Sequence, residues 1–478
     1  MPIINKAVAP IALLLFACAP AGAGGNAKEH AVLEVEKVSP DMIRLSEEIW
    51  RLAETALREE RSSRLLSDYA EAKGFSVSRG AAGMPTAFTA TFGSGRPIVG
   101  IMGEFDALPG LSQKAQPSKE DLASGAAGHG CGHNLFGPAS LGAAVAVKEL
   151  IERGELRGTV VFFGTPAEEA VGGKIYMVRD GLFKGLDAAI AWHPDTEISA
   201  ETDSSQAMVD LRVEFKGKAA HAAYDPWNAR SALDGLELFT HALNLMREHV
   251  KPTVRMHYVV LDGGRVPNVV PDSARLWCWL RDSKRDGVEE LLARVRKIAE
   301  GAGLAAGVEV STFIQSGSPE LLPNMAGSRV LHKNLEWLGP LSYSEAEIDF
   351  ARKLQAAAGV AETGMDGEVK PFDESPGDPE GGSTDVADVS WNVPTIHLTV
   401  ATAPRGIPWH SWAVVAASGS PIGRRGMIYA AKAMAATTAD FFEGPEILNA
   451  MQKEFKEATG GRLYEAWVPD GPPPIPTK

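Results

Sequence analysis

The sequence is poor in cysteine, in long apolar runs and in positive charge. Three cysteines among 478 residues exclude a disulfide-rich scaffold. Beyond the first residues, no uninterrupted apolar run reaches the roughly 18 residues of a membrane span, so we expect none in the mature protein. Lys and Arg total 47 against 61 Asp and Glu, a net charge of −14. This balance argues against nucleic-acid binding, because an acidic surface repels phosphate backbones.

What the sequence does contain is enough apolar material for an ordinary folded protein. Hydrophobic residues make up 45% of the chain, which excludes wholesale disorder. A chain of this length usually divides into two or more domains.

The first residues have the pattern of a secretory signal. Lys6 precedes an apolar run over 7–16, and small residues follow up to Ala23. We therefore expect residues 1–24 to be a signal segment and the protein to be exported, either periplasmic or secreted. The stretch LFAC ending at Cys18 also resembles a lipoprotein box, so a lipid anchor on Cys18 is the alternative to cleavage after Ala23. A buried N-terminal helix is a third interpretation.

Alternating helical and strand patterns follow. Apolar periodicity predicts helices over 40–75 and 135–150, and short apolar runs predict buried strands at 97–102, 159–163, 188–191 and 395–400. Such alternation favours an α/β sheet with helices on both faces.

The pattern changes between residues 206 and 322. The predicted order there is β-α-β-β-α-β, the split βαβ unit of ferredoxin-like α+β domains. We therefore predict an inserted domain at 206–322, a first domain made of 40–205 and 323–445, and a C-terminal tail at 446–478, of which 468–476 is expected to be extended on the surface.

Metal-binding or proton-transferring side chains follow each predicted buried strand. In open α/β sheets, sites form beyond the carboxyl ends of the strands, so these side chains are expected to converge. Imidazole, thiolate and carboxylate together suit divalent metals such as zinc or manganese. The residues that follow strands are Asp106, Glu168, Glu169, His193 and His410, and three further candidates lie in the Gly-rich stretch before the helix at 135–150: His129, Cys131 and His133.

Two short motifs in this set suggest which residues bind metal and which transfer protons. In Cys131-Gly132-His133, two donors stand two residues apart on a locally extended chain. In Glu168-Glu169, one carboxylate can bind metal while the other acts as a base, as metal-assisted hydrolysis requires. Each residue alone is more typical of a structural role, and Cys131 can also be read as a nucleophile activated by His133 or His129.

At these residues the chain resembles the aminoacylase/carboxypeptidase family of co-catalytic metallopeptidases. It is most similar to the amidohydrolase branch, in particular to the p-aminobenzoyl-glutamate hydrolases. The segments that carry the resemblance are GEFDALPGLSQ (103–113), GHGCGHNLFGPAS (128–140), GTPAEEAVGGK (164–174), AWHPD (191–195), KAAHAAYDPWNARSALDG (218–235), VPNVVPDSA (266–274), GSTDVADVSW (382–391) and GIPWHSW (406–412).

The resemblance implies a mixed-sheet, zinc-peptidase-like catalytic domain and two divalent metal ions, Mn or Zn. The ligands it implies are Cys131, His133, Glu169, His193 and His410. It makes Glu168 the general base and counts Asp106 among the catalytic residues. Distant branches have a metal-binding His where this chain has Glu104, so Glu104 is a departure from the family pattern.

The resemblance also assigns roles within the inserted domain. His221 matches a histidine that reaches the partner subunit's site and stabilises the oxyanion. Asn268 matches a position near the substrate, and Arg230 is a candidate partner for an acidic substrate group. A homodimer through the inserted domain is therefore expected.

The function predicted from these observations is metal-dependent hydrolysis of N-acyl or N-aroyl amino acids, such as p-aminobenzoyl-glutamate. The partner is thus a small-molecule amide, with no nucleic acid and no membrane span. Two alternatives stay open at this point: a hydrolase that uses Cys131 as its nucleophile, and a non-catalytic binding protein of the same fold.

Overall fold

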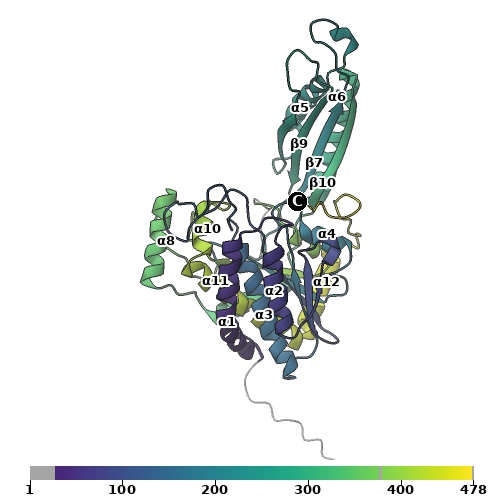
Figure 1. Ribbon diagram of the computed structural model, residues 1–478. Coiled ribbons are helices and arrows are strands. Elements are labelled where there is room, and N and C mark those ends of the chain that lie inside the picture. The colour runs from purple at the N-terminus through teal and green to yellow at the C-terminus, as the bar shows by residue number, and fades with distance from the viewer. Residues whose placement is uncertain (1–26, 376–378, 380, 476–478) are drawn as a thin grey trace, which may run out of the picture.

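A large domain carries a long, narrow insert in the computed structural model (Figure 1), which describes residues 27–375, 379 and 381–475. The predicted leader, with Cys18, lies outside these residues. Within them, no helix has the length and apolar character needed to cross a bilayer.

The large domain is built on a mixed seven-stranded sheet in the order β1-β2-β4-β3-β5-β11-β6. The four central strands β4, β3, β5 and β11 are parallel, and β1, β2 and β6 pair antiparallel. The strands are β1 (Ser76–Arg79), β2 (Phe88–Gly93), β3 (Ile98–Gly103), β4 (Thr159–Gly164), β5 (Ala188–Asp195), β6 (Ser199–Glu201) and β11 (Thr395–Ala401). All six residues of β4 are buried, as expected for a strand covered on both faces.

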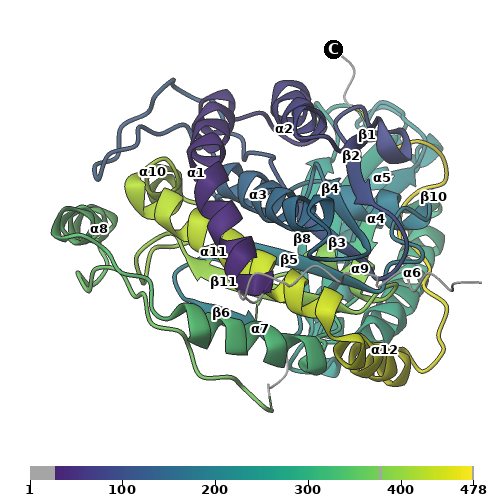
Figure 2. The same ribbon diagram turned by 90° about the horizontal axis from the view of Figure 1, so that it is seen from below.

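Helices cover both faces of this sheet, as the alternating pattern predicted. Helices α1, α3 and α11 pack on one another, with α3 against β3, β4 and β5, and α4 packs on α9, which contacts β5 (Figure 2). The helices of this domain are α1 (Ala27–Leu52), α2 (Glu60–Ala72), α3 (His133–Glu152), α4 (Gly173–Arg179), α7 (Met325–Leu338), α8 (Glu345–Ala358), α9 (Val386–Ser390), α10 (Trp412–Ser418), α11 (Pro421–Glu443) and α12 (Pro445–Thr459).

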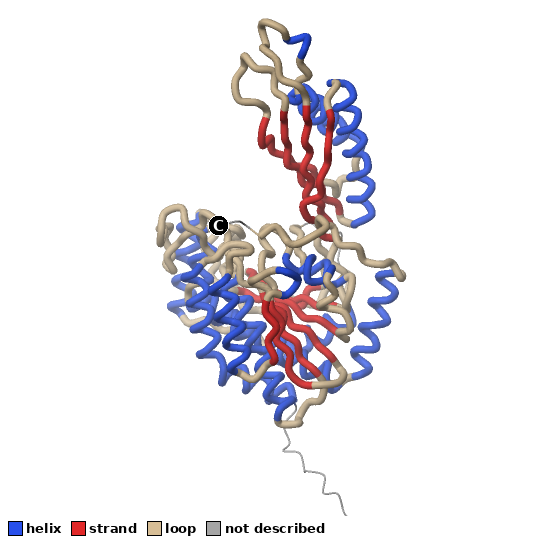
Figure 3. Tube along the Cα trace, turned by 45° about the vertical axis from the view of Figure 1, so that its right-hand side comes forward, coloured by secondary structure: helices blue, strands red, loops and turns tan. Residues whose placement is uncertain are grey.

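The insert has its own four-stranded sheet, in the order β10-β7-β9-β8, with every pair antiparallel. This is the order of a ferredoxin-like split βαβ unit, as predicted. Helices α5 and α6 pack on one face of the sheet, and Figure 3 shows them on one side of the strands. The elements are β7 (Ala207–Lys216), α5 (Ala232–Met246), β8 (Arg255–Asp262), β9 (Ser273–Asp282), α6 (Arg285–Ala306) and β10 (Glu309–Ser318).

One prediction about local structure was wrong, and one helix was not predicted. The helix expected over 40–75 is two helices: α1 starts earlier, at Ala27, and the chain breaks between α1 and α2, where Ala53 and Leu57 adopt positive φ. The tail expected from 446 begins with helix α12, which buries Leu448 and Met451 at helical spacing. The proline-rich end of the tail masked this short amphipathic pattern.

The segment after α12 crosses from the large domain to the insert. On the large domain, the Tyr464 hydroxyl donates a hydrogen bond to Asp388 of α9. On the insert, the Arg285 guanidinium at the start of α6 donates to the Glu465 carbonyl at 2.9 Å and stacks over the Trp467 ring at 4.3 Å. This segment, here called the C-terminal strap (residues 462–468), therefore contacts both domains.

Candidate metal centre

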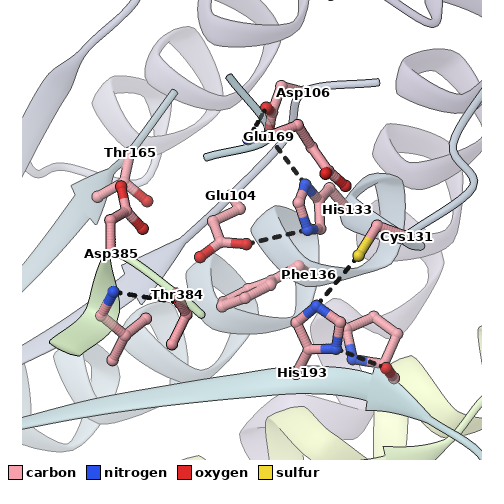
Figure 4. A network of polar contacts seen from close by, with 12 residues as sticks. Glu104, Asp106, Cys131, His133, Phe136, Thr165, Glu169, His193, Thr384 and Asp385 are labelled. Atoms are coloured by element: carbon pink, nitrogen blue, oxygen red, sulfur yellow. Dashed lines mark hydrogen bonds and ion pairs between the residues drawn. The ribbon is translucent and has the colours of Figure 1, made fainter. Parts of the chain in front are cut away.

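The carboxyl ends of the four central parallel strands bring the predicted donor residues together. Glu104 and Asp106 follow β3, Glu169 follows β4, His193 lies in β5, and His410 follows β11. Figure 4 shows Asp106, Cys131, His133, Glu169 and His193 facing one another above the sheet. The convergence expected from the order of strands and donors is present in the fold.

The donor atoms form two overlapping groups. Cys131, His133 and His193 each offer an atom within 4.8 Å of the others, and so do Cys131, Glu169 and His410. The Cys131 Sγ lies 3.3 Å from His193 Nε2, and His410 Nε2 lies 3.3 Å from Glu169 Oε2. Because Cys131 belongs to both groups, the five residues form one cluster rather than two separate sites.

The turn at Gly132 places Cys131 and His133 in this cluster. Gly132 has φ +79° and precedes His133, the first residue of α3. A Cβ at this position would lie 2.9 Å from Cβ of Pro194, the residue after His193. Only glycine combines this backbone conformation with so close an approach to β5.

Asp106 orients two other members of the cluster. A 2.9 Å hydrogen bond joins its Oδ1 to His133 Nδ1, and the Glu169 backbone N–H donates to its Oδ2, also at 2.9 Å. The bond to Nδ1 leaves His133 Nε2 facing the other donors. Asp106 therefore acts as a positioning residue behind His133 and Glu169.

Glu168 and Glu169 are adjacent in sequence, but their surroundings shift the pKa values of the two carboxyl groups in opposite directions. Burial, together with the carboxylates of Glu104, Glu169 and Asp385, raises the pKa of Glu168 well above its usual range. Burial opposes ionisation of Glu169 too, but the hydrogen bond to His410 and the nearby His133 imidazole lower its pKa. Opposed shifts in a carboxylate pair are typical of one group that transfers protons and one that stays ionised.

A buried lysine, which sequence reasoning missed, sits beside Glu104. Lys174 Nζ is 2.6 Å from both Glu104 Oε1 and Asp385 Oδ1, and all three side chains are buried. The other Glu104 oxygen lies 3.0 Å from His133 Nε2, and Glu104, His133 and Glu168 form a third group of close donors. Glu104 thus joins the cluster to a buried ammonium group, where the family resemblance left its role open.

Two residues of the site have left-handed backbones although they are not glycine. Ala167, just before Glu168, has φ 62°, and His410 has φ 55°. The fully buried Glu59 accepts a 3.0 Å hydrogen bond from the Ala167 N–H, and the His410 N–H donates to the Gly130 carbonyl at 3.0 Å. Such strain, about 1 kcal/mol or more per residue, is typical of functional sites and is held here by these bonds.

The donor set fits divalent metal ions. One of its buried atoms, Glu169 Oε1, has no hydrogen-bond partner among the described residues, which is costly unless a cation or another ligand faces it. Burial raises the pKa of the Cys131 thiol, so a thiolate here requires a cation beside it. A cysteine nucleophile would instead need a lowered pKa.

Three predicted site residues lie far from this cluster in the same chain. His221, Asn268 and Arg230 occupy loops at the end of the insert remote from the large domain, since they follow the distal end of β7 or precede that of β9 (Figure 1). Ten residues of β7 separate them from the cluster, a span of about 30 Å. His221 and Asn268 are neighbours, because the Ala222 N–H donates to the Asn268 carbonyl at 3.0 Å.

One cation near the cluster was not predicted. Arg281 of β9 and Glu168 line the same cavity, and the described residues offer Arg281 no carboxylate within ion-pair distance. Its guanidinium donates to Ser383 Oγ at 3.2 Å. Sequence alone did not indicate that this end of β9 meets the cluster.

Comparison with known proteins agrees with this geometry. The model of peptidase family M20/M25/M40 matches residues 100–444. The chain is 35% identical to one of the subunits of p-aminobenzoyl-glutamate hydrolase from Escherichia coli (strain K12) over 463 residues, covering 91% of this chain and 96% of that protein. It is 30% identical to Xaa-Arg dipeptidase of Homo sapiens over 431 residues, covering 86% and 88%.

A solved structure has a similar fold. It is a dinuclear metal-binding peptidase of Bacillus subtilis, with a TM-score of 0.59 at 17% identity, covering 85% of this chain and 99% of that one. The resemblance predicted from the motifs and the predicted fold class are both confirmed.

Proposed function

The chain belongs to peptidase family M20/M25/M40 and is a metallo-amidohydrolase, and from this premise we propose that it hydrolyses N-acyl or N-aroyl amino acids such as p-aminobenzoyl-glutamate. The observation that carries the proposal is the position of Glu168, in one cavity with Glu169 and beside the two donor groups that share Cys131. The relative with 35% identity, whose name specifies this substrate, supports the choice of amide.

Two divalent ions, Mn or Zn, would be held by Cys131, His133, Glu169, His193 and His410, and would lower the pKa of water and polarise the amide carbonyl. Glu168 then accepts the proton of the attacking water and delivers it to the leaving amine nitrogen. Asp106 keeps His133 and Glu169 in place during this transfer.

Arg281 is suited to bind the free carboxylate of the amino acid. It lines the cavity that contains Glu168 and has no carboxylate partner among the described residues. A guanidinium can bind a carboxylate with two parallel hydrogen bonds. Within one chain, Arg281 therefore takes the role that the sequence suggested for Arg230.

We also propose a homodimer in which each insert completes its partner's site. His221 Nδ1 accepts hydrogen bonds from the Ala223 and Tyr224 N–H groups at 3.2 and 3.1 Å, so in the neutral ring the proton is on Nε2. That N–H can donate to an oxyanion. Because His221 is too far from the cluster of its own chain, the oxyanion would be bound at the cluster of another copy.

The surface of the insert suits such pairing. β8 is an edge strand, and Val260 on it and Leu238 and Leu245 on neighbouring α5 are 51%, 44% and 59% exposed. Unpaired strand edges with apolar neighbours are templates for association. A mass of two chains in light scattering, reduced to one by Val260→Asp, is the expected result. A wild-type monomer that is fully active would contradict the proposal.

We also propose that the protein is exported, because residues 1–24 have the sequence pattern of a secretory signal. A fusion that retains this segment should appear outside the cytoplasm, and one that lacks it should stay inside. Metabolic labelling with palmitate distinguishes a lipid anchor on Cys18 from cleavage after Ala23.

The experiment that tests the catalytic proposal is metal removal and reloading. Chelation should abolish hydrolysis of acyl-glutamates, acyl-aspartates and aromatic amides, and Mn or Zn should restore it. Activity that survives chelation but not thiol alkylation would favour a cysteine hydrolase. Metal binding without turnover of any amide would favour a binding protein.

A further inference from the structure

One face of the insert's sheet is not covered by the insert's helices. Along β9, Leu276, Cys278 and Leu280 point into the core shared with α5 and α6, whereas Trp277, Trp279 and Arg281 alternate with them and point the other way. Figure 3 shows both helices on one side of the strands, with the other side open. This second side is here called the open face.

The open face carries aromatic rings and guanidinium groups in rows across the strands. The register places His257 beside Trp279 and Asp210, and Val259 beside Trp277, Arg212 and Phe313. The Arg281 and Arg212 guanidiniums lie 5.1 and 5.8 Å from the centroids of the Trp279 and Trp277 rings. A cavity of about 730 Å³, within the size range of small-molecule sites, is lined by part of this set: His257, Val259, Trp277, Trp279 and Arg281.

The positive charge of this face is not neutralised by ion pairs. Within the described residues, Arg212, Arg255 and Arg281 have no carboxylate oxygen within 4.0 Å. The Asp210 carboxylate in the same face accepts a hydrogen bond of 2.5 Å from the Trp277 indole N–H. A ligand that carries negative charge is therefore favoured over a neutral one.

The open face continues into the catalytic cavity. Trp279 and Arg281 line the 730 Å³ cavity and also the cavity that contains Glu168 and Glu169. Trp277 lies one row farther along β9, about 7 Å from Trp279 along the strand. A molecule whose amide lies at Glu168 can thus extend along this face.

We propose that the open face is a binding site for a planar aromatic group of an anionic substrate, with Trp277 and Trp279 as the residues that select it. The proposal rests on the proposed amide hydrolysis and specifies its substrate class. Indole rings favour planar aromatic groups over saturated groups of equal size, because offset or edge-to-face ring contacts add to area burial. Dimerisation through the β8 edge leaves this face accessible, since a strand added at an edge does not cover either face of a sheet.

Matched ligands test the site without turnover. Benzoate and cyclohexanecarboxylate have the same charge and nearly the same size, so their affinity ratio, measured by calorimetry on the metal-loaded full chain, isolates the aromatic preference. We expect benzoate to bind roughly tenfold more tightly. Trp277→Leu and Trp279→Leu together should bring the ratio close to one, and Trp337→Leu, at an exposed tryptophan of α7, should leave it unchanged.

Two substrate series then show whether the open face binds the acyl side or the amine side of the scissile bond. The first compares benzoyl-glutamate with cyclohexanecarbonyl-glutamate, and the second compares acetyl-phenylalanine with acetyl-cyclohexylalanine. A preference in kcat/KM that falls in the double variant supports the site and assigns it to the acyl side or the amine side. Trp277→Leu alone should produce part of the loss, and circular dichroism checks that each variant is folded.

The site is overturned if wild type binds the two carboxylates equally, or if the double variant keeps the wild-type ratio. A change of oligomeric state with no change in ratio would assign the face to contact between copies of the chain and also overturn it. Failure of all amides to react, with the binding ratio intact, would instead refute the proposed hydrolysis. The two proposals therefore fail separately.

Discussion

The large domain and the insert hold their functional side chains in opposite ways. In the large domain, donors from four strand ends lie against one another, all buried or half-buried except the exposed His410, and each has a partner from another part of the chain. In the insert, His221, Trp277 and Arg281 lie on exposed loops or on an uncovered sheet face. The cluster of metal-binding donors is thus assembled within one chain, whereas the side chains of the insert require a ligand or a second chain to complete their role.

The first prediction concerns Glu168, the proposed general base in the large domain. Glu168→Gln should lower kcat by about 10³-fold or more, because general-base catalysis is lost together with the ionisable group. Metal content by mass spectrometry should stay near that of wild type, since Glu169 and the other ligands are intact. Substantial turnover in this variant would remove Glu168 as the base.

A second prediction compares buried and exposed charges in the two regions. Lys174→Met leaves the carboxylates of Glu104 and Asp385 without their shared cation and should lower the free energy of unfolding by about 3–5 kcal/mol. The matched variant in the insert, Arg275→Met, breaks an exposed pair with Asp262 and should cost less than about 1 kcal/mol. Urea unfolding measures both, and equal losses would contradict the difference drawn between the regions.

A third prediction tests whether the insert acts across a dimer. His221→Ala should lower kcat about 10²-fold by removing an oxyanion donor, and His241→Ala on α5 should not. Mixed with Glu168→Ala chains, the His221→Ala chain should regain turnover at about a quarter of all sites, because each mixed dimer contains one intact site. An absence of recovery in verified mixed dimers would show that sites are not shared.

The smallest effect is expected at Glu59, which supports the loop before Glu168. Glu59→Ala should lower kcat about tenfold with little change in KM, since the Ala167 N–H loses its acceptor, whereas Glu59→Gln retains an acceptor oxygen. Rate measurements on the three proteins test this order, and equal rates would show that Glu59 does not position the loop.

Glu59 also gives a pH dependence of defined sign. Burial, and to a lesser extent the Asp106 charge, raise its pKa from 4.5 to about 8. Between these values the folded chain holds a proton that the unfolded chain has lost, so this residue lowers stability as pH rises. The Tm of wild type relative to Glu59→Gln should therefore fall from about pH 5 to about pH 8. A constant difference would contradict the shift.

Sequence reasoning anticipated the large domain better than the insert for a physical reason. Parallel strands must present their carboxyl ends at one edge, so the order of Asp106, Cys131, Glu169, His193 and His410 along the chain was enough to predict their convergence. No such rule predicts the distance between the tip of the insert and the cluster, because this distance depends on the relative orientation of the two domains.

Residues whose role depends on a single tertiary contact were missed. Lys174 and Glu59 occur in unremarkable local sequence, and only the packing of α4 and α2 places them beside Glu104 and Ala167. Helix α12 was overlooked because its apolar positions are few. Arg281 was also missed, because only the arrangement of the two domains shows that its end of β9 lines the same cavity as Glu168.

The C-terminal strap means that the insert is joined to the large domain by three chain segments and not by two. Any swivel of the insert must detach the Trp467 ring from Arg285 or carry the end of α12 along with it. Removing the residues after Thr459 would leave only the two segments at the ends of the insert to connect the domains. The insert would then move more freely relative to the large domain, without any change in the donor residues of the cluster.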